Sequence, residues 1–524
     1  MRGSLSRRRF LQLVARAGGT RALYATMAEL KLLPVPAAYA GPPQLPPTSG
    51  QGVRVLVLGA GIAGMTAAYE LGRAGYACSV LEARARPGGR SWSIRRGETV
   101  AEEGSMQSCT FDAGPHMYFN AGPARIPHHH RAILGYCKAF GVPLEVMVND
   151  NRATYFQDDG AFSGKAVSAR RVIHDGRGFV AELLAKAISK DALAEAISAE
   201  DKERMLAFVR SFGALRADYS YRGSPRSGYR EAVGLSPGQL NEPLAFSELL
   251  KSEFWEYKLY FSERFDQAAT MLQPVGGMDR IAHAFAERLG SSIAFGTVVT
   301  ALKKTAAGVV AIARDAQGRE FAVEADYAVC TIPFSVLGAL ASDLSPAHKS
   351  AIAACRYVKA SKLAFQADRR FWEEDHDIYG GISWTQRDIT QIWYPSAGFH
   401  AQKGILIGAY IWSDPIAEAF AKMAPQQRLE AAIVSGEKIH PGYRNEVSQG
   451  VAVCWGNVPF SGGAWADWSA EARTSAYPTL NTPDGPIHFA GEHVSYLTGW
   501  QEGAVLSAHN AVHAIAERVQ ARKG

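Results

Sequence analysis

The sequence predicts an α/β plus α+β fold: a Rossmann-like domain assembled from discontinuous segments, a mainly antiparallel-sheet domain and a helical insertion. Three observations predict it. From residue 53 an apolar strand runs into a glycine-rich turn and a helix, helical periodicity marks residues 160–268, and short aromatic and β-branched runs alternate with turns over 350–465. A chain of 524 residues also exceeds what one hydrophobic core usually organises, so two or three interlocked domains are expected.

The first 40 residues carry the whole excess of charge. They hold seven lysines and arginines against one acid, Glu29, which equals the net charge of +6 of the full chain. The body that follows is formally neutral, whereas nucleic-acid recognition normally shows as a basic patch or stripe. No nucleic-acid partner is therefore expected.

The leader 1–40 contains a pattern that resembles the twin-arginine export signal. The pattern is "SRRRFLQ" at Ser6–Gln12, and "AYA" at Ala38–Ala40 would serve as a small-residue cleavage site. The resemblance implies a periplasmic or secreted protein. A basic amphipathic or disordered arm on a cytoplasmic protein is the alternative. The proline-rich residues 41–51 are typical of a linker.

Three further features of the sequence argue against a membrane protein, a disulfide-rich or zinc-binding protein, and a histidine metal site. No uncharged apolar run is long enough to cross a bilayer, so no integral membrane span is expected. The six cysteines stand singly, which favours buried free thiols over a zinc site or a disulfide framework. The consecutive histidines 128–130 do not predict a metal site, because neighbouring side chains point about 100° apart on a helix or to opposite faces of a strand.

The strongest local pattern is "VRVLVLGAGIAGMTAAYELGRAG", which begins at Val53. An apolar strand meets Gly59 and Gly61, and Ala63 and Gly64 lie on a helix that can face a sheet. Glycine is needed because the backbone must approach a pyrophosphate closely, while the helix N-terminus supplies free N–H groups and partial positive charge. The pattern predicts a dinucleotide-binding turn formed by these residues.

A second strand, "ACSVLE", ends in Glu82, where a carboxylate can accept hydrogen bonds from an adenosine ribose. The next stretch, "EARARPGGR", resembles the second glycine signature of flavin amine oxidases, in which the glycines bend the chain beneath the flavin and the arginines approach phosphate. This pairing favours flavin over nicotinamide. The cofactor residues assigned here are Glu82, Ala83, Arg84, Gly88, Gly89 and Arg90.

Resemblance to the flavin amine oxidases recurs along nearly the whole chain after residue 52. It is carried by "FDAGPHMYF", "QPVGGMDRIAHAFAERL", "ADYAVCTIPFSVL" and "IHFAGEHVSYLTGWQEGAVLSAHNAV". The resemblance implies an FAD-binding domain, a substrate-binding domain and a helical insertion. The FAD-binding domain would comprise residues 52–110, 272–345 and 478–524. The substrate-binding domain would comprise residues 111–159 and 346–477, and the helical insertion residues 160–271.

Further cofactor contacts are expected beyond the two glycine turns. "FAGE" ends a strand at Gly491, so Glu492 lies where a carboxylate can hold a ribityl or pyrophosphate-linked hydroxyl. Val299 resembles the position whose backbone contacts adenine, and an ordinary strand valine is the alternative. Ala464 stands where family members with covalent flavin have cysteine, so the FAD is expected to be noncovalent.

Arg125 is the candidate for substrate recognition. Burying a carboxylate is costly without a cation, and "GPARIP" resembles the segment of L-amino-acid oxidases whose arginine grips the substrate carboxylate with a two-pronged pair of hydrogen bonds. A surface arginine, or one paired with an internal acid, is the alternative. Tyr394 in "QIWYPS" resembles the tyrosine that donates another hydrogen bond to that carboxylate, and His130 matches a histidine near the arginine segment.

The remaining candidates would surround the flavin. Trp500 in "LTGWQEG" and Trp465 in "FSGGAWADW" resemble the two aromatic walls of a substrate slot, and Gly499 would offer its carbonyl to the substrate amine. Lys362 resembles the lysine that holds a water beside the reactive flavin nitrogen and assists oxygen reduction. Lys359 is the nearest alternative.

The resemblance implies an FAD-dependent L-amino-acid oxidase. An L-amino acid would lose hydride from its α-carbon to the flavin, and water would hydrolyse the resulting imino acid to a 2-oxo acid and ammonia. Dioxygen would reoxidise the flavin with release of hydrogen peroxide. Tryptophan walls favour flat or apolar side chains, and broad specificity is open. The alternatives are an amine or polyamine oxidase, an amino-acid 2-monooxygenase and a noncatalytic flavoprotein. Family membership also implies a homodimer or a larger homo-oligomer.

Overall fold

The computed structural model describes residues 39–193, 198–256 and 258–523. The expected export signal falls on residues 1–38, outside the described residues. Contacts divide the chain into two units, Met1–Pro42 and Pro43–Gly524, and the helices and strands named here belong to the second. Among the described residues, no helix is both long and apolar enough to cross a bilayer.

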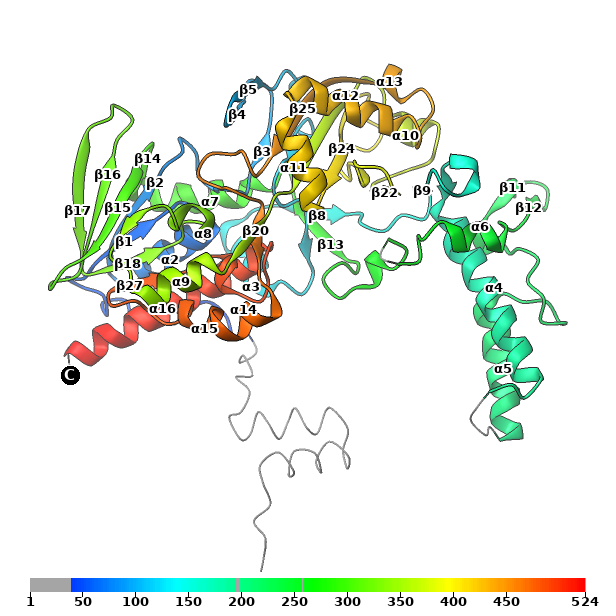
Figure 1. The fold of residues 1–524 in the computed structure, drawn as a ribbon, viewed down its shortest axis with the longest axis horizontal. Coiled ribbons are helices and arrows are strands. Elements are labelled where there is room, and N and C mark those ends of the chain that lie inside the picture. Colours follow the sequence, from blue (N-terminus) through cyan, green and yellow to red (C-terminus); the bar gives the residue numbers. More distant parts are fainter. Residues whose placement is uncertain (1–38, 194–197, 257, 524) are drawn as a thin grey trace, which may run out of the picture. The chain divides into compact units, whose positions relative to one another are not determined.

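A five-stranded parallel sheet gathers strands from distant parts of the chain, in the order β14-β2-β1-β18-β27. The strands are β14 (Ile293–Phe295), β2 (Ala77–Glu82), β1 (Arg54–Leu58), β18 (Tyr327–Cys330) and β27 (Ile487–Phe489). β18 is buried throughout, as expected for a parallel strand with both faces covered. The helices packed on or beside the sheet, all visible in Figure 1, are α2 (Ile62–Arg73), α7 (Asp279–Leu289) and α16 (Gln501–Lys523).

A seven-stranded, mainly antiparallel sheet forms the second layer, in the order β10-β9-β22-β23-β24-β21-β25. Only the β22–β9 pair is parallel. The strands are β10 (Val167–Ser168), β9 (Tyr155–Gln157), β22 (Gly381–Thr385), β23 (Gln391–Tyr394), β24 (Gly404–Ile411), β21 (Ser361–Ala367) and β25 (Val447–Cys454).

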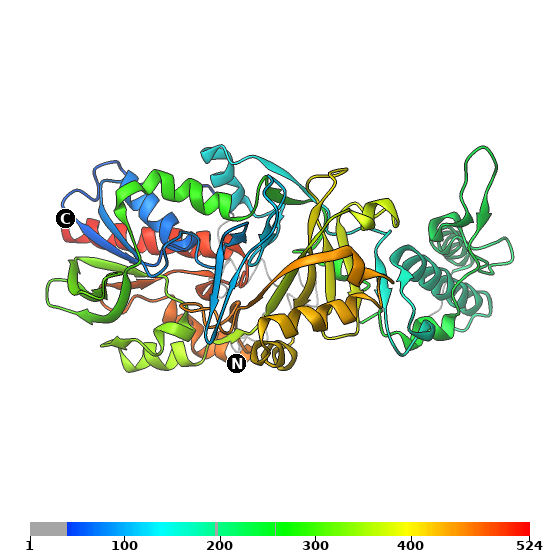
Figure 2. The ribbon, with the colours of Figure 1, turned by 90° about the horizontal axis from the view of Figure 1, so that it is seen from above.

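Helices cover one face of this second sheet, as Figure 2 shows for α11 (Asp414–Lys422) and α12 (Pro425–Gly436). Side chains alternate between faces along each strand. Leu363 of β21 and Tyr394 of β23 therefore pack with the helices, in a core that includes Phe420 and Leu429. Lys362, next to Leu363 in β21, points to the opposite face.

The helical insertion is a hairpin of α4 (Ala169–Ser189) and α5 (Ala199–Gly213), packed around small side chains such as Ala181 and Ala185. The chain returns through α6 (Phe246–Lys251) and a short 3₁₀ turn to β13 (Met271–Pro274). β13 pairs with both β7 (Ile126–Pro127) and β8 (Leu144–Met147). The end of the insertion is therefore anchored beside Arg125, and α3 (Arg131–Phe140) follows β7 directly.

Shorter elements complete the unit. A four-stranded sheet has the order β17-β16-β15-β19, and the other short strands form two-stranded ladders. These elements are β3 (Ser93–Ile94), β4 (Thr99–Glu102), β5 (Ser105–Ser108), β6 (Phe119–Asn120), β11 (Tyr229–Glu231), β12 (Gln239–Leu240), β15 (Val298–Lys304), β16 (Val309–Arg314), β17 (Glu320–Ala325), β19 (Ala341–Ser342), β20 (Arg356–Val358), β26 (Trp465–Asp467), α8 (Phe334–Leu337), α9 (Pro346–Ala353), α10 (Phe371–Glu374), α13 (Tyr443–Glu446), α14 (Ala470–Ser475) and α15 (Tyr477–Leu480).

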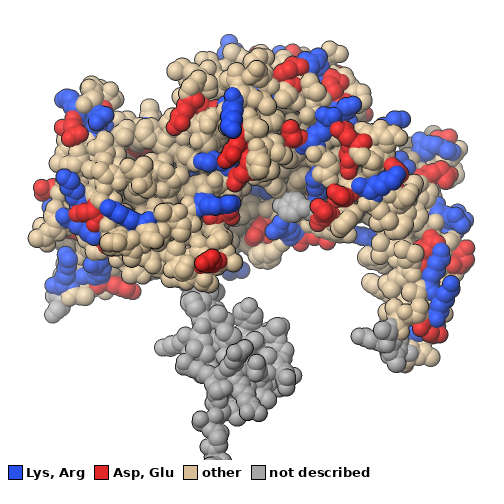
Figure 3. Space-filling model, in the orientation of Figure 1, with Lys and Arg blue, Asp and Glu red and all other residues tan. Residues whose placement is uncertain are grey.

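The cysteines agree with the expectation of buried free thiols, with one exception. All six cysteines are free, and all but Cys78 are buried. Burial raises the pKa of the Cys78 and Cys330 thiols to about 12, which keeps them protonated and unreactive near neutral pH. On the face drawn in Figure 3, lysines and arginines lie interspersed with aspartates and glutamates rather than in one field.

Candidate active site

The turn between β1 and α2 forms a cradle that contains three glycines, and each glycine is required for a different reason. Gly59 has φ +106°, and a Cβ there would lie 2.7 Å from the Thr331 hydroxyl oxygen. A Cβ on Gly64 would lie 2.0 Å from the Gly59 carbonyl oxygen, so Gly64 lets α2 pack closely on the strand. A Cβ on Gly61 would meet no atom of the described residues within 4 Å, because it would point into a cavity. The space beside Gly61 is where a phosphate can approach the helix N-terminus.

A second glycine turn is joined to this cradle through Glu82. The Glu82 carboxylate accepts hydrogen bonds from the backbone N–H of Ala60 at 2.7 Å and of Arg84 at 2.9 Å. The N–H of Gly88 donates to the Ala60 carbonyl at 2.8 Å. The end of β2 and both turns are thereby fixed at one edge of the parallel sheet, and the carboxylate keeps lone pairs for a ribose.

One cavity of about 1420 Å³ runs from these turns toward the second sheet. The predicted site residues that line it are Gly59, Gly61, Ala63, Glu82, Ala83, Arg84, Gly88, Gly89, Arg90, Val299, Lys362, Trp465, Gly491, Glu492, Gly499 and Trp500. Gly64, Arg125 and Tyr394 do not line it. An open phosphate cradle beside a helix N-terminus and a carboxylate placed for a ribose, both on one continuous cavity, fit a flavin adenine dinucleotide.

Two arginines near the glycine turns add positive charge to this end. The Arg84 side chain donates to the Ser461 hydroxyl at 2.8 Å, and the Arg86 guanidinium lies over the Trp92 ring. Burial, together with the neighbouring Arg84, lowers the pKa of Arg86 to about 9, and burial also lowers the pKa of Arg84. An anionic ligand beside these cations would offset the cost of burying them.

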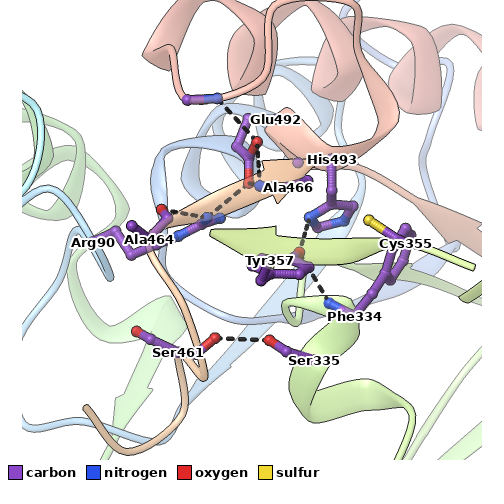
Figure 4. A network of polar contacts seen from close by, with 12 residues as sticks. Arg90, Phe334, Ser335, Cys355, Tyr357, Ser461, Ala464, Ala466, Glu492 and His493 are labelled. Carbon is purple, nitrogen blue, oxygen red and sulfur yellow. Dashed lines mark hydrogen bonds and ion pairs between the residues drawn. The ribbon is translucent and has the colours of Figure 1, made fainter. Parts of the chain in front are cut away.

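Glu492 holds three parts of the cavity wall together (Figure 4). Its carboxylate accepts a hydrogen bond from the Arg90 guanidinium at 2.7 Å, from the Gly499 N–H at 3.0 Å and from the Ala466 N–H at 3.3 Å. Burial raises the pKa of Glu492, but Arg90 and the other donors outweigh burial and hold it below its usual value. Glu492 was expected to hold a cofactor hydroxyl; in this geometry most of its lone pairs serve the protein and position Gly499.

The rest of this network lies beneath the same wall. Arg90 also donates to the Ala464 carbonyl at 3.0 Å, and the Tyr357 hydroxyl lies 3.2 Å from His493 Nδ1 and accepts from the Phe334 N–H at 3.0 Å. Figure 4 shows these contacts around the β20–β26 ladder. Ala464 is thus fixed by its carbonyl in the cavity wall.

Lys362 lies at the opposite end of the cavity, on β21, and is 2% exposed. Its ammonium donates to the carbonyls of Gly122 and Asn120 and lies 4.3 Å from the centre of the Tyr410 ring. Burial, and then the nearby Arg125, lower the pKa of Lys362 well below its usual value. Lys359, the alternative lysine, donates instead to the Gly462 carbonyl at 3.0 Å and does not line the cavity.

Arg125 lies in an aromatic enclosure next to the cavity. The guanidinium carbon is 4.6 Å from the centre of the Trp393 ring and 5.6 Å from those of Phe261 and Trp500. Its Nε and Nη2 both donate to the Gln267 side-chain oxygen. The side chain is 9% exposed, which excludes the surface-loop alternative.

The structure corrects the assignment of Tyr394. Trp393 and Tyr394 are neighbours on β23 and therefore point to opposite faces of the sheet. The Tyr394 hydroxyl is bonded to His440 Nε2 at 2.5 Å and to the Ser383 hydroxyl at 2.8 Å, within the helix-covered core. Trp393, one residue earlier, takes the place beside Arg125 that the sequence reasoning gave to Tyr394.

Sequence reasoning also missed Gln267, Trp393 and Tyr410. The alternation of "QIWY" could have shown that Trp393 and Tyr394 cannot both face the site. The alternation of side chains along β24 could likewise have shown that Tyr410 faces the cavity. Gln267 gave no signal, since it lies 142 residues from Arg125 in the sequence.

Comparison with known proteins gives the same family over most of the chain. The family model described as flavin containing amine oxidoreductase matches residues 62–516. The flavin-dependent L-tryptophan oxidase RebO of Lentzea aerocolonigenes is 28% identical over 487 residues, which cover 88% of this chain and 98% of that protein. An L-amino-acid oxidase of Siganus canaliculatus is 27% identical over 485 residues, covering 90% of this chain and 86% of the other.

Solved structures match the fold. Cyclohexylamine oxidase from Brevibacterium oxydans IH-35A superposes with a TM-score of 0.60 at 17% identity, covering 89% of this chain and 99% of that chain. A putrescine oxidase bound to putrescine gives a TM-score of 0.59 at 17% identity, with the same coverage. At such identity these two structures show the fold and do not decide between an amine and an amino acid as substrate.

Proposed function

The chain belongs to the flavin containing amine oxidoreductases, and from this premise we propose that it is an L-amino-acid oxidase with noncovalently bound FAD. It would convert L-amino acids to 2-oxo acids and ammonia, with release of hydrogen peroxide. The alternatives within the family are an amine or polyamine oxidase and an amino-acid 2-monooxygenase. A flavoprotein without catalytic activity is the alternative outside it.

The observation that carries the proposal is the buried Arg125 guanidinium within the aromatic enclosure. Burial and then Arg125 lower the pKa of the nearby Lys362, so Arg125 is the group that supplies positive charge at this end of the cavity. A positive site disfavours a protonated diamine and favours a substrate that brings a carboxylate. The Arg125 fork matches the two oxygens of that carboxylate, once the Gln267 oxygen has moved aside.

Each remaining residue then has a task in positioning the substrate. When bound, the flavin accepts the hydride that the substrate α-carbon loses. Arg125 would hold the carboxylate, and the Gly499 carbonyl, whose orientation is set by the Gly499 N–H bond to Glu492, would receive the amine. Trp465 and Trp500 restrict the carbon between them, and Lys362 would hold a water for proton transfer during oxygen reduction.

The aromatic enclosure supports a preference for flat or apolar side chains. Trp393, Phe261 and Trp500 surround the Arg125 guanidinium, and Tyr410 lies over Lys362. The similarity to an L-tryptophan oxidase supports the same choice. Activity on many L-amino acids would also fit these walls, because stacking on indole rings is tolerant of shape.

The test uses pairs of compounds that differ only in the carboxylate. Flavin-loaded enzyme is mixed anaerobically with L-tryptophan or tryptamine, and with L-phenylalanine or phenethylamine, and the loss of flavin absorbance is recorded. Bleaching by the amino acids alone supports the proposal, and faster bleaching by the amines would establish the amine oxidase instead. No bleaching by any amino acid or amine would point to the noncatalytic flavoprotein. Under air, peroxide with 2-oxo acid indicates an oxidase, whereas an amide with carbon dioxide indicates a monooxygenase.

Two properties outside the site complete the proposal. The pattern at Ser6–Gln12 supports export to the periplasm or medium, and membership of this family supports a homodimer or larger homo-oligomer. Changing Arg7 and Arg8 to lysine should retain the protein in the cytoplasm, which cell fractionation would show. Unchanged export would refute the twin-arginine assignment. Light scattering of the purified protein would give its mass in solution.

A further inference from the structure

The segment 264–270, between the helical insertion and β13, is attached to the substrate end of the cavity at several points. The Gln267 carbonyl accepts a hydrogen bond from the Asn149 side chain at 2.7 Å, and the Gln267 side chain accepts from Arg125. Phe265 packs its ring 4.1 Å from that of His129, measured between centres. Asp266 Oδ1 lies 3.3 Å from His129 Nε2.

His129, His130 and Asp266 each bring one potential ligand atom to within 4.8 Å of the others. Three consecutive histidines cannot converge on one ion within a regular helix or strand. The chain is irregular here: the His130 N–H donates to the Pro127 carbonyl and the Arg131 N–H to the His129 carbonyl. This turn lets two adjacent rings approach a carboxylate from another segment.

A second observation points to a ligand at this cluster. His130 is 1% exposed, and its Nε2 is buried without a hydrogen-bond partner among the described residues. A buried polar nitrogen without a partner costs about 1–3 kcal/mol. Asp266 keeps 43% of its side-chain surface exposed, so an ion could reach the cluster from solvent.

We propose that His129, His130 and Asp266 bind a divalent transition-metal ion of the zinc class. Two imidazoles and one carboxylate are ligands that suit Zn²⁺, with water in the fourth position. Tetrahedral bonds of about 2.1 Å place ligand atoms about 3.4 Å apart. The His129–Asp266 pair already has that spacing, and small side-chain rotations would draw His130 in from the present limit of 4.8 Å.

The ion would also affect substrate binding, and this step rests on the proposed function. Asp266 and Gln267 are adjacent, so an ion that fixes Asp266 also holds the Gln267 oxygen on two donors of Arg125. A substrate carboxylate must displace that oxygen to reach the fork. Bound metal therefore raises KM for L-amino acids and leaves the rate at saturation unchanged.

Binding is tested on flavin-loaded protein without a histidine tag, by calorimetric titration with Zn²⁺. His129→Ala and Asp266→Asn should weaken Zn²⁺ binding about tenfold or more. His128→Ala is the matched control, because His128 is the exposed neighbour outside the cluster. It should bind Zn²⁺ within about twofold of the parent.

The same titration can overturn the site. Equal weakening by His128→Ala, or unchanged binding by His129→Ala, would show that Zn²⁺ binds only to surface histidines. Asp266→Asn preserves shape, so thermal unfolding without metal should match the parent and exclude misfolding as the cause.

The effect on substrate has its own measurement. Zn²⁺ should raise KM for the best L-amino acid severalfold in the parent, and Gln267→Ala should abolish this rise while still binding Zn²⁺ in the calorimeter. Zn²⁺ binding without any change in KM would refute the coupling. If no amino acid is oxidised at all, the proposed function fails, and the calorimetric result still decides the metal site.

Discussion

At the dinucleotide end of the cavity the backbone forms the site, whereas at the substrate end side chains form it. Gly61 leaves space at the helix N-terminus, while the N–H groups of Gly59 and Gly88 donate to the carbonyls of Leu81 and Ala60 and so fix the two adjoining turns. Arg125, Lys362 and Trp500 come from three separate elements and are oriented by their neighbours. A site made of backbone tolerates no added atoms, while a site made of side chains depends on charge and on which face of a strand each residue occupies.

The largest effect is expected from adding a side chain to the backbone end. Gly61→Val places atoms where a cofactor phosphate would lie, and a Cβ there touches no described protein atom, so the chain should fold without flavin. Flavin content after purification should fall by more than about tenfold, with helix content unchanged by circular dichroism. Gly72→Ala in α2 also has open space around it and serves as the control. A flavin-loaded Gly61→Val protein would show that the cradle is not at this turn.

At the other end the charge of Arg125 should matter most. Arg125→Met removes two charge-assisted hydrogen bonds, about 3 to 4 kcal/mol, so kcat/KM for an L-amino acid should fall about 10²- to 10³-fold. Most of the loss should appear in KM. Arg125→Lys keeps the positive charge but lacks the two-pronged guanidinium geometry, so its kcat/KM should lie between those of the parent and Arg125→Met. Unchanged kinetics in Arg125→Met would remove the carboxylate role.

Lys362 gives a pH test of the same end. Burial and Arg125 lower its pKa, so its protonation changes below the ordinary lysine value of about 10.4. Lys362→Met should slow reoxidation of reduced flavin by oxygen about 10²-fold and flatten its pH dependence in that range. Stopped-flow mixing with oxygenated buffer measures both. A variant with the parent pH profile would mean that another group titrates.

The smallest effect is expected on the far face of β23. Tyr394→Phe removes a hydroxyl bonded to His440 and Ser383 in the core, so stability should fall by about 1 kcal/mol while KM stays within about twofold. Trp393→Ala, one residue earlier, should instead raise KM because its ring lies over Arg125. Urea unfolding and steady-state kinetics of the two variants would separate the two faces. A large KM change in Tyr394→Phe would restore the original assignment.

The difference between the two ends of the cavity also explains which site residues could be predicted from the sequence. Gly59, Gly61 and Glu82 stand in short patterns whose physical reason is local, and each lines the cavity. The parallel strands could also be predicted from the sequence, because buried strands such as Tyr327–Cys330 form continuous apolar runs. Local patterns were therefore enough to predict a set of residues that the fold brings to one end of one cavity.

The substrate end could be anticipated only in part. Arg125 was found through a motif, but its partner Gln267 lies in a segment that only the folded chain brings near. Tyr394 was misplaced because resemblance does not fix register, and a shift of one residue moves a side chain to the other face of the strand. The approach of Asp266 to two histidines likewise depends on an irregular turn that no periodic pattern encodes.

The pairing of β13 has a consequence for engineering. Met271 pairs with Pro127 and Leu272 with Ile126. The chain that leaves the helical insertion is therefore held in a fixed β-sheet register next to Arg125. An exchange of residues 169–251 for the corresponding piece of a relative would leave the β13–β7 pairing and Gln267 outside the exchanged piece. Ala169, Val172, Leu244 and Leu249 share a core with Phe261 and Trp393, so such an exchange must keep these positions apolar, with its downstream joint placed before residue 264.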